Sequence, residues 1–130
     1  MEKARELAAS ADRSSVADVY IGHMLAHAPQ DAVDSAWPHR VVRDLIEKVK
    51  SADLERGIQV ARLNMKRGGF IDPKDPGADE RHLAEQARVW ARSAAAWPRT
   101  NAMLSKLVQT WESSATHWEE HFRQEEMRPD

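Results

Sequence analysis

The sequence predicts an all-α protein, a compact bundle of five to six helices with a long C-terminal helix. Apolar residues recur three and four positions apart through most of the chain, which is the spacing of one helical face. Valine and isoleucine, which favour strands, are spread singly, whereas alanine, leucine, glutamate and arginine are common. Proline and glycine mark where one helix ends and the next begins.

The first helices are expected within residues 1–50. Residues 2–28 form either one bent helix or two short ones, and turn-forming residues at 29–36 lead to a helix that begins at Pro38. The apolar side of the first segment contains Val16, Val19, Tyr20 and Met24. The buried face of the second is expected to contain Val41, Val42, Leu45, Ile46 and Val49.

The next helix is expected to begin at an Asp53 cap and to end at Gly68-Gly69, where glycine supplies the positive φ of a helix C-terminus. Prolines and a glycine in residues 70–78 predict an irregular loop. The buried stripe of this helix is expected to be Leu54, Ile58, Ala61 and Met65.

The last two helices are expected to form an antiparallel hairpin. Asp79 caps the first, which runs to about Ala96, and Pro98 breaks it and begins the second, which extends to about Glu126. The first carries the buried stripe Leu83, Ala87, Trp90, Ala94 and Trp97. The second carries the stripe Leu104, Val108, Trp111, Ala115, Trp118 and Phe122.

The 130 residues are expected to form a single helical domain, with N-terminal helices at 1–50, a helical unit at 53–126 and a tail at 127–130. The chain has no cysteine, no apolar run long enough to cross a bilayer and no signal peptide, so we expect a cytoplasmic protein that does not use a membrane. Its net charge of −2 argues against binding to nucleic acid.

Two histidine pairs are candidate metal ligands. His23 and His27 are four residues apart, as are His117 and His121, so each pair is expected to project from one face of a helix. If the two helices were neighbours, four imidazoles could bind zinc or another divalent transition metal. The alternative is a set of solvated histidines, because six histidines in 130 residues make this spacing unsurprising.

An arginine row is predicted around the helix expected from Asp79 to about Ala96, opposite its apolar stripe. It consists of Arg81, Arg88, Arg92 and Arg99. Such a row can contact phosphates or an acidic partner protein, since guanidinium groups match both. The alternative is a solvated face balanced by neighbouring glutamates.

The second half contains three motifs, N-x-x-R-G from Asn64, E-R-x-L-A from Glu80 and W-P-R-T from Trp97. With these motifs, residues from about 54 to 126 resemble a group of small, uncharacterised bacterial helical proteins. Ala78-Asp79 stands where that group has Gly-Gly, and Trp111 stands where Tyr is usual. The resemblance implies a recurring helical unit, and it implies no activity and no catalytic residue.

The leading functional interpretation is a non-catalytic protein-interaction or regulatory module that binds a protein partner or itself. Five tryptophans are many for this length and suit an interface, although they also suit a bundle core; Trp90, Trp111 and Trp118 are the candidates. No catalytic motif is found, so no catalytic residue and no cofactor are expected. The alternatives are a metal-binding protein that uses the histidine pairs and a nucleic-acid-binding protein that uses the arginine row.

Overall fold

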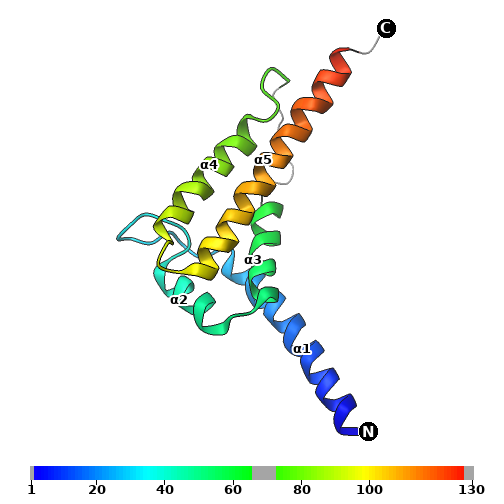
Figure 1. The fold of residues 1–130 in the computed structure, drawn as a ribbon, viewed down its shortest axis with the longest axis vertical. Helices are drawn as coiled ribbons and strands as arrows, with labels where there is room; N and C mark the ends of the chain where they lie inside the picture. Colours follow the sequence, from blue (N-terminus) through cyan, green and yellow to red (C-terminus); the bar gives the residue numbers. More distant parts are fainter. Residues whose placement is uncertain (1, 66–72, 128–130) are drawn as a thin grey trace. The chain divides into compact units, whose positions relative to one another are not determined.

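The computed structural model describes the backbone of residues 2–65 and 73–127, and the side chains from residue 14 onward within these ranges. In these ranges the chain forms five α-helices and no strand (Figure 1). The helices are α1 (Glu2–Leu25), α2 (Arg40–Val49), α3 (Ala52–Asn64), α4 (Ala78–Ser93) and α5 (Pro98–Glu126). The predicted all-α class and the long C-terminal helix are confirmed.

The helices group into two compact units, Met1–Lys66 and Arg67–Asp130. The first holds α1, α2 and α3, and the second holds α4 and α5. The predicted division between the N-terminal helices and the second helical unit, between residues 50 and 53, is the junction between α2 and α3. In the structure α3 packs against α1 and belongs to the first unit. The prediction of a single domain stays a prediction.

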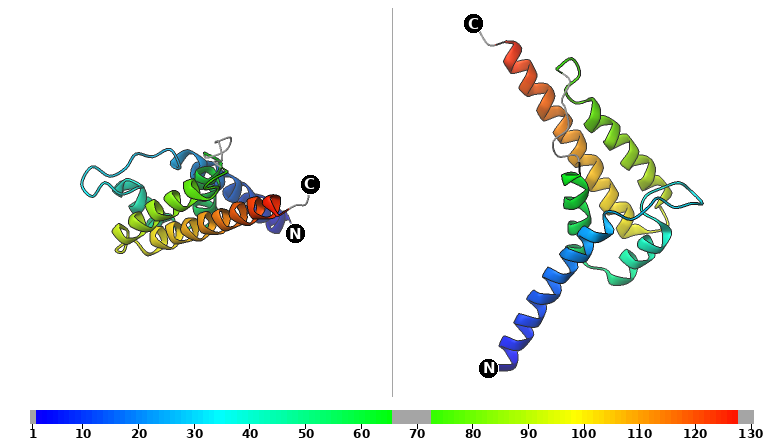
Figure 2. Two further views of the ribbon diagram at one scale, coloured as in Figure 1. Left: turned by 90° about the horizontal axis from the view of Figure 1, so that it is seen from above. Right: turned by 180° about the vertical axis from the view of Figure 1, so that it is seen from behind.

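In the first unit, α1 and α3 run side by side in the same direction (Figures 1 and 2). They come closest at two glycines. A Cβ atom added to Gly22 would lie 2.3 Å from the carbonyl oxygen of Leu54, and one added to Gly57 would lie 2.4 Å from that of Val19. Because both obstacles are backbone atoms, neither position has room for a side chain.

Two helix starts in the first unit differ from the sequence predictions. α3 is capped by Ser51, whose hydroxyl oxygen accepts a hydrogen bond from the Leu54 amide at 3.1 Å, and Asp53 lies in the first turn instead. α2 begins after His39, whose Nδ1 accepts a hydrogen bond from the amide of residue 41, so Pro38 lies outside the helix.

α4 begins after Gly77, and the predicted Asp79 cap is also wrong because Asp79 lies within the first turn. A Cβ atom at Gly77 would lie 2.8 Å from Oε1 of Glu119 and 3.0 Å from the carbonyl oxygen of Ala115. The start of α4 therefore rests directly on α5. The helix ends at Ser93, three residues before the predicted end. The predicted Gly68-Gly69 stop lies outside the described residues.

The predicted antiparallel hairpin of α4 and α5 is present (Figure 1). Pro98 occupies the first turn of α5, and Asn101 Nδ2 donates to the carbonyl oxygen of Ala91 at 2.7 Å, which ties the corner between the helices. The buried residues of α4 are Glu80, Ala84, Ala87, Trp90 and Ala91. Those of α5 are Thr100, Met103, Leu104, Leu107, Val108, Trp111 and Ala115.

Replacement of Gly57 by alanine should destabilise the protein. Alanine favours a helix by about 1 kcal/mol over glycine, but overpacking with backbone shifts costs about 1–3 kcal/mol, and the clash here is with the backbone of α1. Chemical denaturation should show a net loss for Gly57→Ala. Val60→Ala, at an exposed position of the same helix, is the control and should change stability by less than about 0.5 kcal/mol. A gain in stability for Gly57→Ala would contradict the close crossing.

Candidate interaction site

An apolar row on α1 is exposed to solvent. Val16, Tyr20 and Met24 follow one another at four-residue spacing, and 68%, 72% and 66% of their surface is accessible. Ala17 and Ile21 are exposed beside them on the same side of the helix. We call these five residues the α1 stripe. A contiguous exposed apolar patch of this kind is typical of a protein contact surface.

The α1 stripe lies on the side of α1 that faces away from α3. At 100° per residue, Tyr20 and Gly22 are roughly 160° apart around the helix axis when measured the shorter way. Of the apolar residues noted in this segment, Val19 lies with its backbone against Gly57 of α3, whereas Val16, Tyr20 and Met24 are exposed. α3 packs on the opposite side because the glycine there allows a close approach.

α1 extends well beyond the helix on which it packs. It has 24 residues and α3 has 13, which correspond to about 36 Å and 20 Å. The hydroxyl of Ser15 donates to Asp53 and that of Ser51 donates to Asp18, both at 2.7 Å, so these α1 residues lie beside the start of α3. The backbone of α1 before Ser15 thus projects past α3 (Figure 2).

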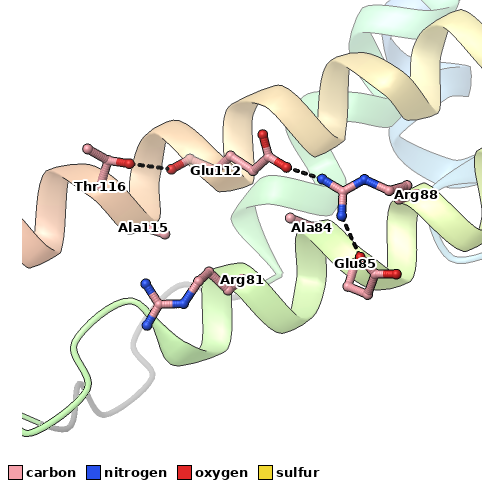
Figure 3. A pocket seen from close by; sticks show the side chains of 7 residues that line it. All are labelled: Arg81, Ala84, Glu85, Arg88, Glu112, Ala115 and Thr116. Carbon is pink, nitrogen blue, oxygen red and sulfur yellow. Dashed lines mark hydrogen bonds and ion pairs between the residues drawn. The ribbon is translucent and has the colours of Figure 1, made fainter.

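In the second unit, α4 and α5 border a cleft of about 390 Å³ (Figure 3). Ala84 and Ala115 face each other across it. Arg88 pairs with Glu85 of its own helix and with Glu112 of α5, and the hydrogen bond that its guanidinium donates to Glu85 is the main reason why the pKa of Arg88 is raised. The lining residues are Arg81, Ala84, Glu85, Arg88, Glu112, Ala115 and Thr116.

The predicted arginine row is divided between two helices. Arg81, Arg88 and Arg92 follow α4, but Arg99 comes after Pro98 and belongs to α5, so the prediction of one row on one helix is wrong. The chain turns at this proline before Arg99 can join the face of α4.

The other arginines of α4 also face carboxylates. Arg81 pairs with Asp75 before the helix and with Glu119 of α5, and Arg92 Nη2 lies 3.7 Å from Oε1 of Glu85. A phosphate or an acidic partner at this surface would compete with carboxylates that are already in place.

Two of the three candidate tryptophans are buried. Trp90 and Trp111 are 7% and 9% accessible, so their indole rings offer little surface to a partner. Trp118 is half-buried near the end of α5, where its ring centroid lies 5.5 Å from that of His117 and 5.8 Å from that of His121. Trp118 is thus the candidate tryptophan with accessible surface.

The two histidine pairs have different local structures. His117 and His121 are exposed on α5 and pack edge-on against the ring of Trp118. α1 ends at Leu25, so His27 lies beyond it, and the prediction that His23 and His27 share a helical face is wrong. Among the residues that the structure describes, no group of three or more histidines and carboxylates is placed to hold a metal ion. The metal site stays a prediction.

A buried arginine that the sequence analysis did not single out organises the loop between α1 and α2. Arg43 has no accessible surface, and its guanidinium donates to Asp34 at 2.8 and 2.9 Å and to the carbonyl oxygens of Pro38 at 2.7 Å and Ala36 at 3.2 Å. The hydrogen bond with Arg43 holds the pKa of the Asp34 carboxyl well below its usual range. The predicted buried face of α2 is therefore partly wrong: Ile46 is buried together with Arg43, whereas Val41 and Val49 are exposed.

Asp31 holds the other side of this loop. Its carboxylate oxygens accept hydrogen bonds from the backbone amides of Val33 at 2.7 Å and Arg40 at 2.9 Å, and these bonds lower the pKa of Asp31. Such a bond from an amide two residues later is a common aspartate turn. The turn-rich composition of residues 29–36 predicts a loop but not these particular contacts.

Trp37 connects the same loop to α3. Its Nε1 donates to the carbonyl oxygen of Ala28 at 2.7 Å, and the guanidinium carbon of Arg62 lies 4.3 Å from its ring centroid. A cation above an indole ring is attracted by its electron density. Burial lowers the pKa of Arg62.

Comparison with known proteins adds no relative: no family model, no curated protein and no solved structure matches the chain. The resemblance to uncharacterised bacterial helical proteins stays a prediction. Across residues 2–65 and 73–127, none of the helices combines the length and the apolar character needed to cross a bilayer.

Substitution of Arg43 by methionine should cost roughly 3 kcal/mol of unfolding free energy, because it leaves buried acceptors without their donor. Arg43→Lys keeps the charge but lacks the two-pronged guanidinium, so it should fall between methionine and wild type. Arg56→Met, at an exposed position of α3, is the control. Equal stability of Arg43→Met and Arg56→Met would show that the loop does not depend on Arg43.

Acidification should remove the contribution of Asp34. Because the folded state lowers its pKa below the ordinary value of 3.8, this contribution is complete above that value and is lost as the pH falls toward the folded-state pKa. Asp34→Asn lacks the carboxylate at every pH. The difference in melting temperature between the two proteins should therefore narrow as the pH falls from about 5 to about 2. A difference that stays constant across this range would count against the ion pair.

Proposed function

We propose that this chain is a non-catalytic protein-interaction module and that the α1 stripe is its contact surface. The observation that carries the proposal is the exposure of Val16, Tyr20 and Met24 in one row on a continuous helix. α3 covers the side of α1 that carries Gly22, and the α1 stripe leaves a second, apolar side of the same helix uncovered. An exposed apolar patch of this kind is typical of a protein contact surface.

The energetics favour a reversible contact. Transfer of a large apolar side chain out of water contributes about 1.5–3 kcal/mol, so the three large residues contribute roughly 5–9 kcal/mol. Association costs an estimated 4–15 kcal/mol in lost freedom. The three residues therefore offset much of this cost, and a stable complex needs additional contacts along the rest of the partner surface.

Four charged groups with shifted pKa values are not suited to proton transfer. General acid–base catalysis works best when a pKa lies near the working pH. The hydrogen bonds of Asp31 and Asp34 move the pKa of each carboxyl down, and those of Arg43 and Arg88 move each pKa up. These groups therefore keep their charges and serve to hold the structure. The lack of cysteine suits a reducing compartment such as the cytoplasm.

Photo-crosslinking in cells tests the proposed contact. A photoreactive phenylalanine derivative in place of Tyr20 should form a protein adduct, because Tyr20 is the most accessible large residue of the α1 stripe. The same probe in place of Val89, an exposed residue of α4, is the control and should form none.

The additional change Met24→Glu should reduce the adduct at position 20 by at least about tenfold, since it places a charge in the contact. Circular dichroism should confirm that each variant folds. Equal adducts at positions 20 and 89, or no adduct at position 20, would overturn the proposed function.

A further inference from the structure

We propose that His117 and His121 together form a binding site for a divalent transition metal of the class to which zinc belongs. The site lies on the C-terminal part of α5 and does not depend on the α1 stripe or on its partner. Imidazole nitrogen is the commonest protein ligand for metals of this class. The helix that joins the two residues, the indole ring that both contact and the charge around them support this site.

The two histidines project from one side of an unbroken helix. α5 is continuous from Pro98 to Glu126, so residues 117 and 121 lie one turn apart, with Cβ atoms about 5–6 Å from each other. Both side chains are exposed. Two histidines at this spacing on one helical face hold a single zinc ion in the H-E-x-x-H motif, so the spacing itself suits the chemistry.

The structure distinguishes this pair from the other four histidines. His23 lies on α1, but His27 follows the end of that helix, so their equal spacing in the sequence does not place them on one helical face. His39 uses its Nδ1 to accept a backbone amide at 3.1 Å, and His82 has no histidine three or four residues away. The pair on α5 is therefore the one in which two imidazoles share a side of a helix.

Trp118 orients both imidazoles. Its ring centroid lies 5.5 Å from that of His117 and 5.8 Å from that of His121, and the planes meet at 69° and 88°. Two rings that pack edge-on against the same indole are held on the same side of α5. A ligand whose rotamer is already limited by packing loses less conformational freedom when it binds a metal.

The surroundings of the pair favour a cation. Residues 117–126 contain four glutamates and one arginine. The C-terminal end of a helix also carries a partial negative charge. Within the part of the chain that the structure describes, no group of three or more histidines and carboxylates is gathered to hold a metal. Two protein nitrogens therefore hold the ion, and its other coordination positions are open to water.

Calorimetric titration with zinc chloride tests the site on the full-length protein, produced without a histidine tag. We expect one zinc ion per chain. His117→Gln and His121→Gln should each weaken zinc binding by at least about tenfold, because loss of a residue that only orients a ligand already costs about 10–100-fold. The double variant should lose less affinity than the product of the two single losses, since either substitution breaks the same chelate.

Two other histidines supply matched controls. His23→Gln and His82→Gln each replace an exposed histidine of a helix outside the pair, and both variants should bind zinc as the wild-type protein does. Magnesium chloride is the control for the metal, because magnesium prefers oxygen ligands and should not bind at the pair. Circular dichroism should confirm that each variant folds.

Hydrogen exchange locates the bound ion. Zinc should slow amide exchange in the last two turns of α5, because a metal that joins residues 117 and 121 ties successive turns together, and His117→Gln should abolish this protection. Zinc binding that is equally strong in wild type and His117→Gln would indicate an adventitious ion only and would overturn the inference. An equal loss of affinity in His23→Gln, binding without slower exchange in α5, or no binding by the wild-type protein would also overturn it.

Discussion

The contact between Gly22 of α1 and Gly57 of α3 is the constraint on which the first unit depends. It brings the two helix backbones so close that neither position accepts a Cβ atom. Glycine in the middle of a helix is unfavourable by about 1 kcal/mol, so Gly57, in the middle of α3, needs a compensating contact. The close packing supplies it. By selecting which side of α1 meets α3, the same contact leaves the α1 stripe on the other side.

Helical periodicity predicted the second unit well because its pattern has one interpretation. Leu104, Val108, Trp111 and Ala115 repeat at spacings of four and three, and all are buried. Trp118 and Phe122, the last members of the predicted stripe, are only half-buried. In α1 the pattern is compatible with either of two sides facing α3, because apolar or small residues lie both on the side of Tyr20 and on the side of Gly22. Periodicity identified Val16, Tyr20 and Met24 as one face, but it could not show which face α3 would cover. That choice depended on Gly22, a residue without a side chain to enter a hydrophobic pattern.

The loop between α1 and α2 illustrates a different limit of sequence reasoning. Turn-forming residues predicted an irregular segment, and Asp31 forms an aspartate turn of the expected kind. Nothing in the local pattern distinguishes Arg43 from an exposed arginine of a helix. Its burial follows from four acceptor contacts made by residues five to nine positions earlier, after the chain has folded back. A buried charge of this kind is tolerated only when its partners are all in place.

The two candidate surfaces, the arginines of α4 and the α1 stripe, differ in whether their side chains already have partners within the protein. The arginines of α4 are conspicuous in the sequence, yet Arg81 and Arg88 already pair with carboxylates of α5. A ligand there would exchange one exposed ion pair for another, and such exchanges change the free energy little. The α1 stripe has no such internal partner to exchange. Covering it would remove apolar surface from water, which favours association and offsets part of its cost in lost freedom. We therefore place the proposed contact on α1, although charge patterning alone points to α4.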